Sequence, residues 1–111
     1  MRTRKDGPAP SPSPFRDPRL QALLRALQGR FRGVYPGIPG QPKGPVSIMT
    51  AYLPERGPAG FALTVLDADR DEQGLAEAFA EAERDRIFGV DAPAVSVTFR
   101  YPRPGTRGRV L

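Results

Sequence analysis

The apolar positions between residues 18 and 31 predict a helix. Leucines recur at i, i+3, i+4 and i+7, and Phe31 continues this single stripe. Asp17 is a good N-cap residue, and Pro18 stands at the first helical position, where its missing N–H is not needed. We therefore expect a helix over 18–31, with its arginines on the other surface and Gly33 able to stop it.

A second helix is predicted over residues 70–88. Asp69 precedes it as the N-cap, and Glu72 lies three residues later in the capping-box pattern. Gly89 follows the last turn as a C-cap candidate. The stripe that we expect to be buried consists of Leu75, Ala76, Phe79, Ala80, Ala82 and Ile87.

Three runs of alternating side chains predict strands over residues 46–53, 61–67 and 94–101. The first two are separated by a loop of hairpin size with Pro and Gly at both ends. The third run alternates most clearly, with apolar residues on one face and small, polar or charged residues on the other, as in a half-buried strand. Its expected inner face is formed by Val95, Val97, Phe99 and Tyr101.

The element order α-β-β-α-β predicts an α+β fold, with two helices packed on one face of a small, mostly antiparallel, three-stranded sheet. Two strand orders are compatible with it. If the second and third strands are parallel, the helix between them forms a right-handed crossover. If the first strand lies between them, the order is 2-1-3 and the third strand is antiparallel to the first.

The distribution of proline and charge predicts one domain with extensions. We expect a single domain over residues 17–102, which contains a Pro-rich connector at 33–45. A Pro-rich basic arm at 1–16 is expected to be disordered or loosely docked, because each proline disfavours helix at the residue before it. A basic tail follows at 103–111.

The composition excludes several classes of chemistry. The 111 residues include no Cys and no His, which removes disulfides, thiol nucleophiles and imidazole mechanisms, and no serine has a base positioned to activate it. We expect no enzymatic activity and no cofactor, and identify no small-molecule substrate. No apolar run could span a bilayer or act as a signal peptide, so we expect a cytoplasmic protein without membrane contact. The absence of Cys and Asn would suit a hot environment.

One acidic cluster resembles a metal site. Asp67, Asp69 and Asp71 have the spacing that opens a calcium loop, but Glu72 stands where the loop needs Gly, and Ala78 stands where it needs Glu. Magnesium binding by the first two aspartates is an open alternative. Helix capping and a strand end account for the same residues, so we predict no metal site.

Charge is segregated along the chain, whose formal net charge is +5. Residues 1–66 carry a net charge of +7, residues 67–91 one of −6, and residues 92–111 one of +4. Such asymmetry often marks an interaction surface. Two interpretations stay open: the acidic segment pairs with the basic helix of its own chain, or with that of a second copy.

The sharpest functional prediction is a basic surface that binds nucleic acid, or more broadly an acidic partner. Arginine binds phosphate in a bidentate manner, and cations beside aromatic rings are typical of proteins that grip single strands. The segment GRFRGVYPG combines both features. RNA and DNA are not distinguished. We predict phosphate contacts from Arg30, Arg32, Lys43, Arg100 and Arg103, with Tyr35 or Tyr101 stacking on bases.

The alternative is a homo-oligomeric protein-interaction or adaptor module with no nucleic-acid role. Three strands and two helices form a small core, so with either function we expect a homodimer, which would bury the remaining sheet face or edge. Prolines at every third position from 36 to 45 have the spacing of a polyproline II ligand, or of a strap across the surface. Strong salt sensitivity of the oligomer would favour pairing between oppositely charged helices of two copies.

Overall fold

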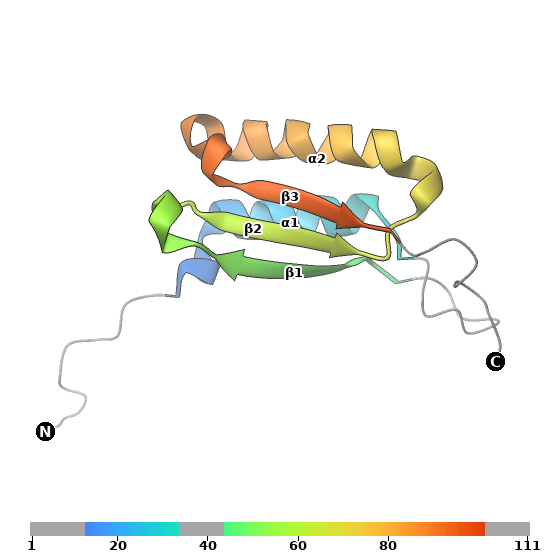
Figure 1. Ribbon diagram of the computed structural model, residues 1–111, viewed down its shortest axis with the longest axis horizontal. Helices are drawn as coiled ribbons and strands as arrows, with labels where there is room; N and C mark the ends of the chain where they lie inside the picture. The colour runs from blue at the N-terminus through green and yellow to red at the C-terminus, as the bar shows by residue number, and fades with distance from the viewer. Residues whose placement is uncertain (1–12, 34–43, 102–111) are drawn as a thin grey trace, which may run out of the picture.

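The protein is described by a computed structural model at residues 13–33 and 44–101 (Figure 1). Within these ranges, no helix is long and apolar enough to cross a membrane. The predicted α+β class, with two helices on one face of a three-stranded sheet, is confirmed. Its main elements are α1 (Pro18–Arg30), β1 (Ser47–Tyr52), β2 (Phe61–Leu66), α2 (Gln73–Phe88) and β3 (Ser96–Arg100). The 3₁₀ turn η1 (Pro14–Arg16) precedes α1, and the turns η2 (Pro54–Arg56), η3 (Arg70–Glu72) and η4 (Gly89–Ala94) lie between the later elements.

Helix α1 forms where the leucine stripe predicts it. The Asp17 carboxylate accepts a 2.8 Å hydrogen bond from the N–H of Arg19 and so caps the N-terminus. The helix ends at Arg30, earlier than Gly33, because Phe31 adopts an extended backbone (φ −115°, ψ 144°). Its buried face consists of Leu20, Leu23 and Leu27.

The sheet has the order β1-β2-β3. β1 and β2 form an antiparallel hairpin with Tyr52 opposite Phe61, whereas β2 and β3 are parallel with Leu66 opposite Arg100. The alternative order 2-1-3 is therefore wrong. β2 takes the central place because every second residue is buried and the rest are half-buried, whereas β1 exposes every second residue to solvent.

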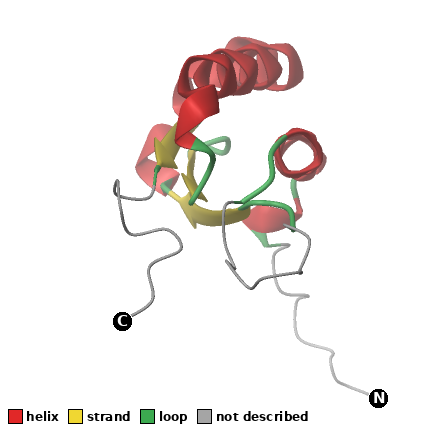
Figure 2. Cartoon of the chain, turned by 90° about the vertical axis from the view of Figure 1, so that its right-hand side faces the viewer, coloured by secondary structure: helices red, strands yellow, loops and turns green. Residues whose placement is uncertain are grey.

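Both helices lie on the same side of the sheet (Figure 2), and one hydrophobic core packs between them and the sheet. Phe31, at the end of α1, connects this helix to α2 and to the sheet. Its ring meets Phe79 of α2 edge-on at 5.5 Å and Phe99 of β3 edge-on at 5.8 Å. No described element covers the opposite face of the sheet. Met49 of β1 is 55% exposed on that face, and Thr98 of β3, on the far side of β2, is also exposed.

Helix α2 buries a narrower stripe than its sequence predicts. Ala76 and Ala80 are buried as predicted. Leu75 is 69% exposed and Ala82 is also exposed, so the prediction that Leu75 and Ala82 are buried is wrong. Successive residues of a helix are about 100° apart, so Leu75 lies well to one side of Ala76. Alanines occur on both faces of α2, and they therefore did not define its inner face.

The described end of the N-terminal arm belongs to the fold. In η1 the Phe15 N–H donates to Ser13 Oγ at 3.2 Å, and the Phe15 ring centroid lies 6.4 Å from that of the buried Phe61. Residues 13–16 are thus docked on the fold through this aromatic contact. Residues 1–12, 34–43 and 102–111 lie outside the described residues.

Candidate functional site

The described members of the predicted nucleic-acid set lie at one end of the molecule. Arg30 and Arg32 stand at the end of α1, and Arg100 and Tyr101 stand at the end of β3. Here the parallel strands β2 and β3 have their carboxyl ends, which face the viewer in Figure 2. Binding crevices commonly form at this edge of open sheets with parallel strands. The other predicted residues, Tyr35, Lys43 and Arg103, lie outside the described residues.

Backbone contacts tie three segments together at this end. β2 is followed by Asp67, which turns the chain with a φ of +57° and donates its N–H to the Arg100 carbonyl oxygen at 2.9 Å. Aspartate tolerates this left-handed backbone better than most residues. Ala68 then forms a β-bridge with Gly33, whose N–H donates to the Gly44 carbonyl oxygen at 3.1 Å. Residues 34–43 and 102–111 therefore join the fold close to one another.

Arg30 is engaged in contacts within the chain. Its Nη1 lies 3.3 Å from a carboxylate oxygen of Glu72, and its guanidinium carbon lies 5.1 Å from the Phe31 ring centroid and 6.0 Å from that of Phe79. The two charged side chains are 41% and 44% exposed, so their ion pair contributes at most about 1 kcal/mol. A phosphate reaches Arg30 only in competition with Glu72.

Arg32 is an exposed cation whose orientation is fixed by the end of α1. Its Nη1 donates to the carbonyl oxygens of Gln28 at 2.9 Å and Phe31 at 3.3 Å. A cation is favoured there, because a helix C-terminus presents carbonyls without intrahelical partners. Both bonds use a single nitrogen, and the guanidinium has further donors on Nε and Nη2. Arg32 is thus anchored and still equipped to bind an anion.

At the end of β3, Arg100 is exposed on the open face of the sheet, whereas Tyr101 is packed. The Tyr101 ring stacks on Phe99 at 6.0 Å, the guanidinium carbon of Arg70 lies 5.7 Å from its centroid, and its hydroxyl donates to Glu77 at 3.3 Å. Partial burial, followed by the negative charge of Glu77, raises the pKa of Tyr101 to about 12. Stacking of a base on this ring must compete with contacts that already exist.

A cleft of about 230 Å³ lies between the end of α1 and the start of α2. Its charged side chains are balanced, because two arginines stand against two carboxylates. Of the two arginines in the cleft, Arg30 is paired with Glu72, whereas Arg32 bonds to backbone carbonyls. It is lined by Arg30, Phe31, Arg32, Ala68, Asp69, Glu72 and Ala76.

The acidic cluster has structural roles. The Asp69 carboxylate accepts a 3.0 Å hydrogen bond from the Asp71 N–H and caps η3, the 3₁₀ turn before α2. The helix α2 itself begins at Gln73, later than the predicted residue 70, with Glu72 at its N-cap position. Glu72 makes no capping hydrogen bond and pairs with Arg30 instead, so the predicted capping box is only half formed. Among the described residues, no group of three or more acidic side chains is arranged to hold a metal ion.

The charge of the folded part differs from that of the whole chain. The described residues carry ten basic and eleven acidic side chains, and the remaining residues carry seven basic and one acidic. Within the fold, Arg19 pairs with Asp91 at 2.9 Å and Arg30 pairs with Glu72, so the acidic segment pairs with the basic helix of its own chain. The excess positive charge resides in residues 1–12, 34–43 and 102–111.

Sequence reasoning missed Arg70, which contacts the ring of Tyr101. It lies among four acidic residues, and that local pattern directed attention to the acids. Its contact depends on β3 returning beside β2, which local spacing does not reveal.

Function has to be inferred from the side chains at this end of the sheet, because no related protein indicates a function. Comparison with known proteins finds no matching family model, no matching curated protein and no matching solved structure.

Proposed function

We propose that this protein binds nucleic acid, in a non-catalytic role, at the carboxyl end of its sheet. Arg32 and Arg100 contact phosphates, and Arg30 joins them when a phosphate displaces Glu72. One observation supports this most directly. The ends of α1 and β3, which carry Arg30, Arg32 and Arg100, lie at the same end of the sheet, where residues 34–43 and 102–111, which add four basic residues, join the fold.

The charge balance indicates how such binding works. Since the described residues carry one more acidic than basic side chain, the fold itself attracts a polyanion only weakly. Long-range attraction then comes from the basic segments, and the ordered arginines fix the position of the backbone. We expect deletion of residues 102–111, which removes three arginines, to weaken binding more than any single substitution in the fold.

The test is fluorescence anisotropy of labelled single-stranded RNA and duplex DNA, titrated with the full chain at low and near-physiological salt. Binding at both salt concentrations supports the proposal. The slope of log K against log salt then reports the contacts, at about −0.7 for each phosphate on a single strand and −0.9 on a duplex. Absence of binding at either salt concentration overturns it.

A matched pair of variants separates a site from general attraction. Arg100→Gln removes a cation from the carboxyl end, and Arg16→Gln removes one from η1 at the opposite end of the molecule (Figure 1). We expect Arg100→Gln to weaken binding and to reduce the salt slope by about one contact, and Arg16→Gln to change neither. Equal effects would mean that the whole surface attracts the probe without a site.

One observation favours the second candidate, a homo-oligomeric interaction module. The open face of the sheet exposes Met49 and Ala51 of β1, and a second copy could bury this face. Light scattering of the wild type and of Met49→Glu tests this. A dimer that the charged residue dissociates, in a protein that binds no nucleic acid, supports the second candidate over the first.

A further inference from the structure

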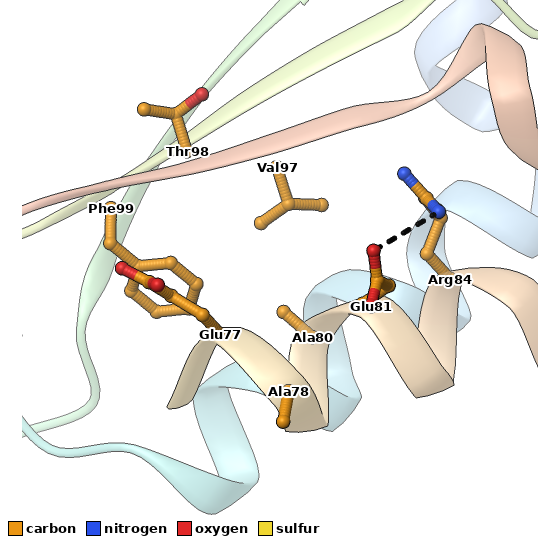
Figure 3. Close-up of a pocket in the computed structure, with 8 residues that line it drawn as sticks. All are labelled: Glu77, Ala78, Ala80, Glu81, Arg84, Val97, Thr98 and Phe99. Atoms are coloured by element: carbon orange, nitrogen blue, oxygen red, sulfur yellow. Dashed lines mark ion pairs between the residues drawn. The ribbon is translucent and has the colours of Figure 1, made fainter. Parts of the chain in front are cut away.

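A groove of about 550 Å³ runs between α2 and β3 (Figure 3). Val97 and Phe99 project from β3 toward the helix, and Ala80 faces them from α2. These side chains supply the apolar part of the groove's lining. Glu77 and Glu81 of α2 line it as well, and both are exposed to solvent. The groove is separate from the cleft beside Arg32.

The backbone of β3 faces this groove with hydrogen-bonding groups. Arg100 accepts from Asp67, so its backbone bonds toward β2. Residues that bond to one neighbour alternate along a strand with residues that bond to the other side. Val97 and Phe99 therefore direct their N–H and C=O groups away from β2, and β3 is the last strand of the described sheet.

Arg84 marks one end of the groove and supports this alternation. It extends from α2 and donates to the carbonyl oxygen of Val95 at 3.3 Å. Val95 lies two residues before Val97, so its carbonyl group points to the same side, away from β2. A side chain thus already satisfies one outward carbonyl of the strand edge. Arg84 also lies 3.9 Å from Glu81, the ion pair drawn in Figure 3.

The negative charge on α2 indicates which kind of peptide strand the groove can bind. Glu77, Glu81 and Asp85 recur at every fourth residue of α2 and are exposed. Pairing of β3 with β3 of a second copy would bring two such acidic stripes together, and like charges repel. A basic strand meets complementary charge instead. Its side chains on the helix face would place cations against the carboxylates, with their aliphatic stems over Ala78 and Ala80.

We propose that the groove binds an extended basic peptide, which adds to β3 as a further strand. Main-chain bonds to Val97 and Phe99 provide affinity, and Glu77 and Glu81 select arginine or lysine at alternate positions. The exposed strand edge, the apolar lining and the acidic stripe all lie along the same side of β3.

A short labelled peptide of alternating Arg and Val, N-acetylated, is the probe, measured by anisotropy against the full chain. Two isomers carry backbone N-methyl groups, one on the Arg residues and the other on the Val residues. Only one set of N–H groups faces β3 in an added strand. We expect one isomer to bind about tenfold or more weakly and the other to bind like the parent peptide. Equal affinity of both isomers overturns strand addition.

Protein variants test the charge. We expect Glu77→Gln/Glu81→Gln to weaken parent-peptide binding about three- to tenfold, because two exposed ion pairs are lost. The control, Glu55→Gln/Glu83→Gln, makes the same charge change outside the groove lining and is expected to leave binding unchanged. Equal weakening by both double variants overturns the proposal. So does a dimer whose formation competes with the peptide, because β3 would then pair with a second copy.

Discussion

The two ends of the sheet hold the chain in different ways. At the hairpin end, residues 53–60 form a tight loop that the backbone itself closes, with a 2.6 Å hydrogen bond from the Leu53 N–H to the Gly60 carbonyl oxygen. At the carboxyl end, a few backbone contacts around Asp67 are supplemented by exposed charged side chains such as Arg30 and Glu72. The loop at the hairpin end is closed by a tight steric fit, whereas the carboxyl end presents charged side chains to solvent.

Because of this difference, substitutions at the hairpin end should change stability, and substitutions at the carboxyl end should change binding. A steric change at the hairpin end affects the free energy of unfolding and leaves the charged surface in place. A charge change at the carboxyl end costs little stability, because exposed ion pairs are weak. It nevertheless alters the electrostatics that a polyanion meets. Substitutions at the two ends should therefore move different observables, which makes the comparison testable.

The largest effect is expected at Gly60. A Cβ there would overlap the Leu53 carbonyl oxygen and lie 2.9 Å from the Cβ of Arg56, so the loop must shift to accommodate Gly60→Ala. We expect a loss of about 2 kcal/mol in the free energy of unfolding, measured by urea denaturation.

Gly74→Ala is the matched control for this substitution. Gly74 lies in the first turn of α2 with no atom within 4 Å of an added Cβ, so the same chemical change is expected to stabilise the protein by up to about 1 kcal/mol. A Gly60→Ala variant with an unchanged urea midpoint would show that the loop is not sterically constrained.

A smaller effect is expected at the other end, at Asp67. Its φ of +57° is disfavoured for residues with a branched Cβ, so Asp67→Val should destabilise the protein by about 1–2 kcal/mol. Asp67→Asn tolerates the same backbone and removes the charge. We expect it to unfold at nearly the wild-type urea concentration. If Asn destabilises as much as Val, the carboxylate matters and the backbone conformation does not.

Local rules predicted much of this fold from the sequence. Asp17, Pro18 and the leucine stripe define α1 because capping and helical periodicity act within a few residues. The faces of β3 followed from simple alternation. The strand order did not follow, because it depends on which strand pairs along both of its edges, and local alternation does not show that. The inner face of α2 also escaped prediction, because alanine fits a buried surface and an exposed one equally well.

The candidate site was less predictable for a related reason. Arg30, Arg32 and Arg100 could be identified as cations, but their partners come from segments distant in sequence. The pairing of Arg30 with Glu72 and the contact of Arg70 with Tyr101 required the return of β2 and β3 to one edge. Charge patterning therefore located the basic residues without showing which of them the fold already uses.

A pair of substitutions at one ion pair sharpens the contrast between stability and binding. Arg30→Gln and Glu72→Gln both break the 3.3 Å pair, and each should cost less than about 1 kcal/mol of stability. Their effects on nucleic-acid affinity should be opposite, because Glu72→Gln releases a cation and Arg30→Gln removes it. Anisotropy titrations with single-stranded RNA measure both. Changes of the same sign would exclude competition between Glu72 and phosphate.

The smallest effect concerns pH and Tyr101. Its pKa of about 12 in the folded protein exceeds the ordinary value of 10.0, mainly because the phenol is partly buried and then because Glu77 is nearby. Between these values the unfolded chain loses a proton that the folded chain retains, so this contribution to stability is complete below pH 10 and is lost as pH rises toward 12. We expect a phenolate absorbance step near pH 12 that Tyr101→Phe removes and Tyr52→Phe preserves, together with a flatter alkaline stability profile for Tyr101→Phe. Survival of that step in Tyr101→Phe would assign it to another phenol, and the packing of Tyr101 against Phe99 and Arg70 would then not hold its hydroxyl beside Glu77.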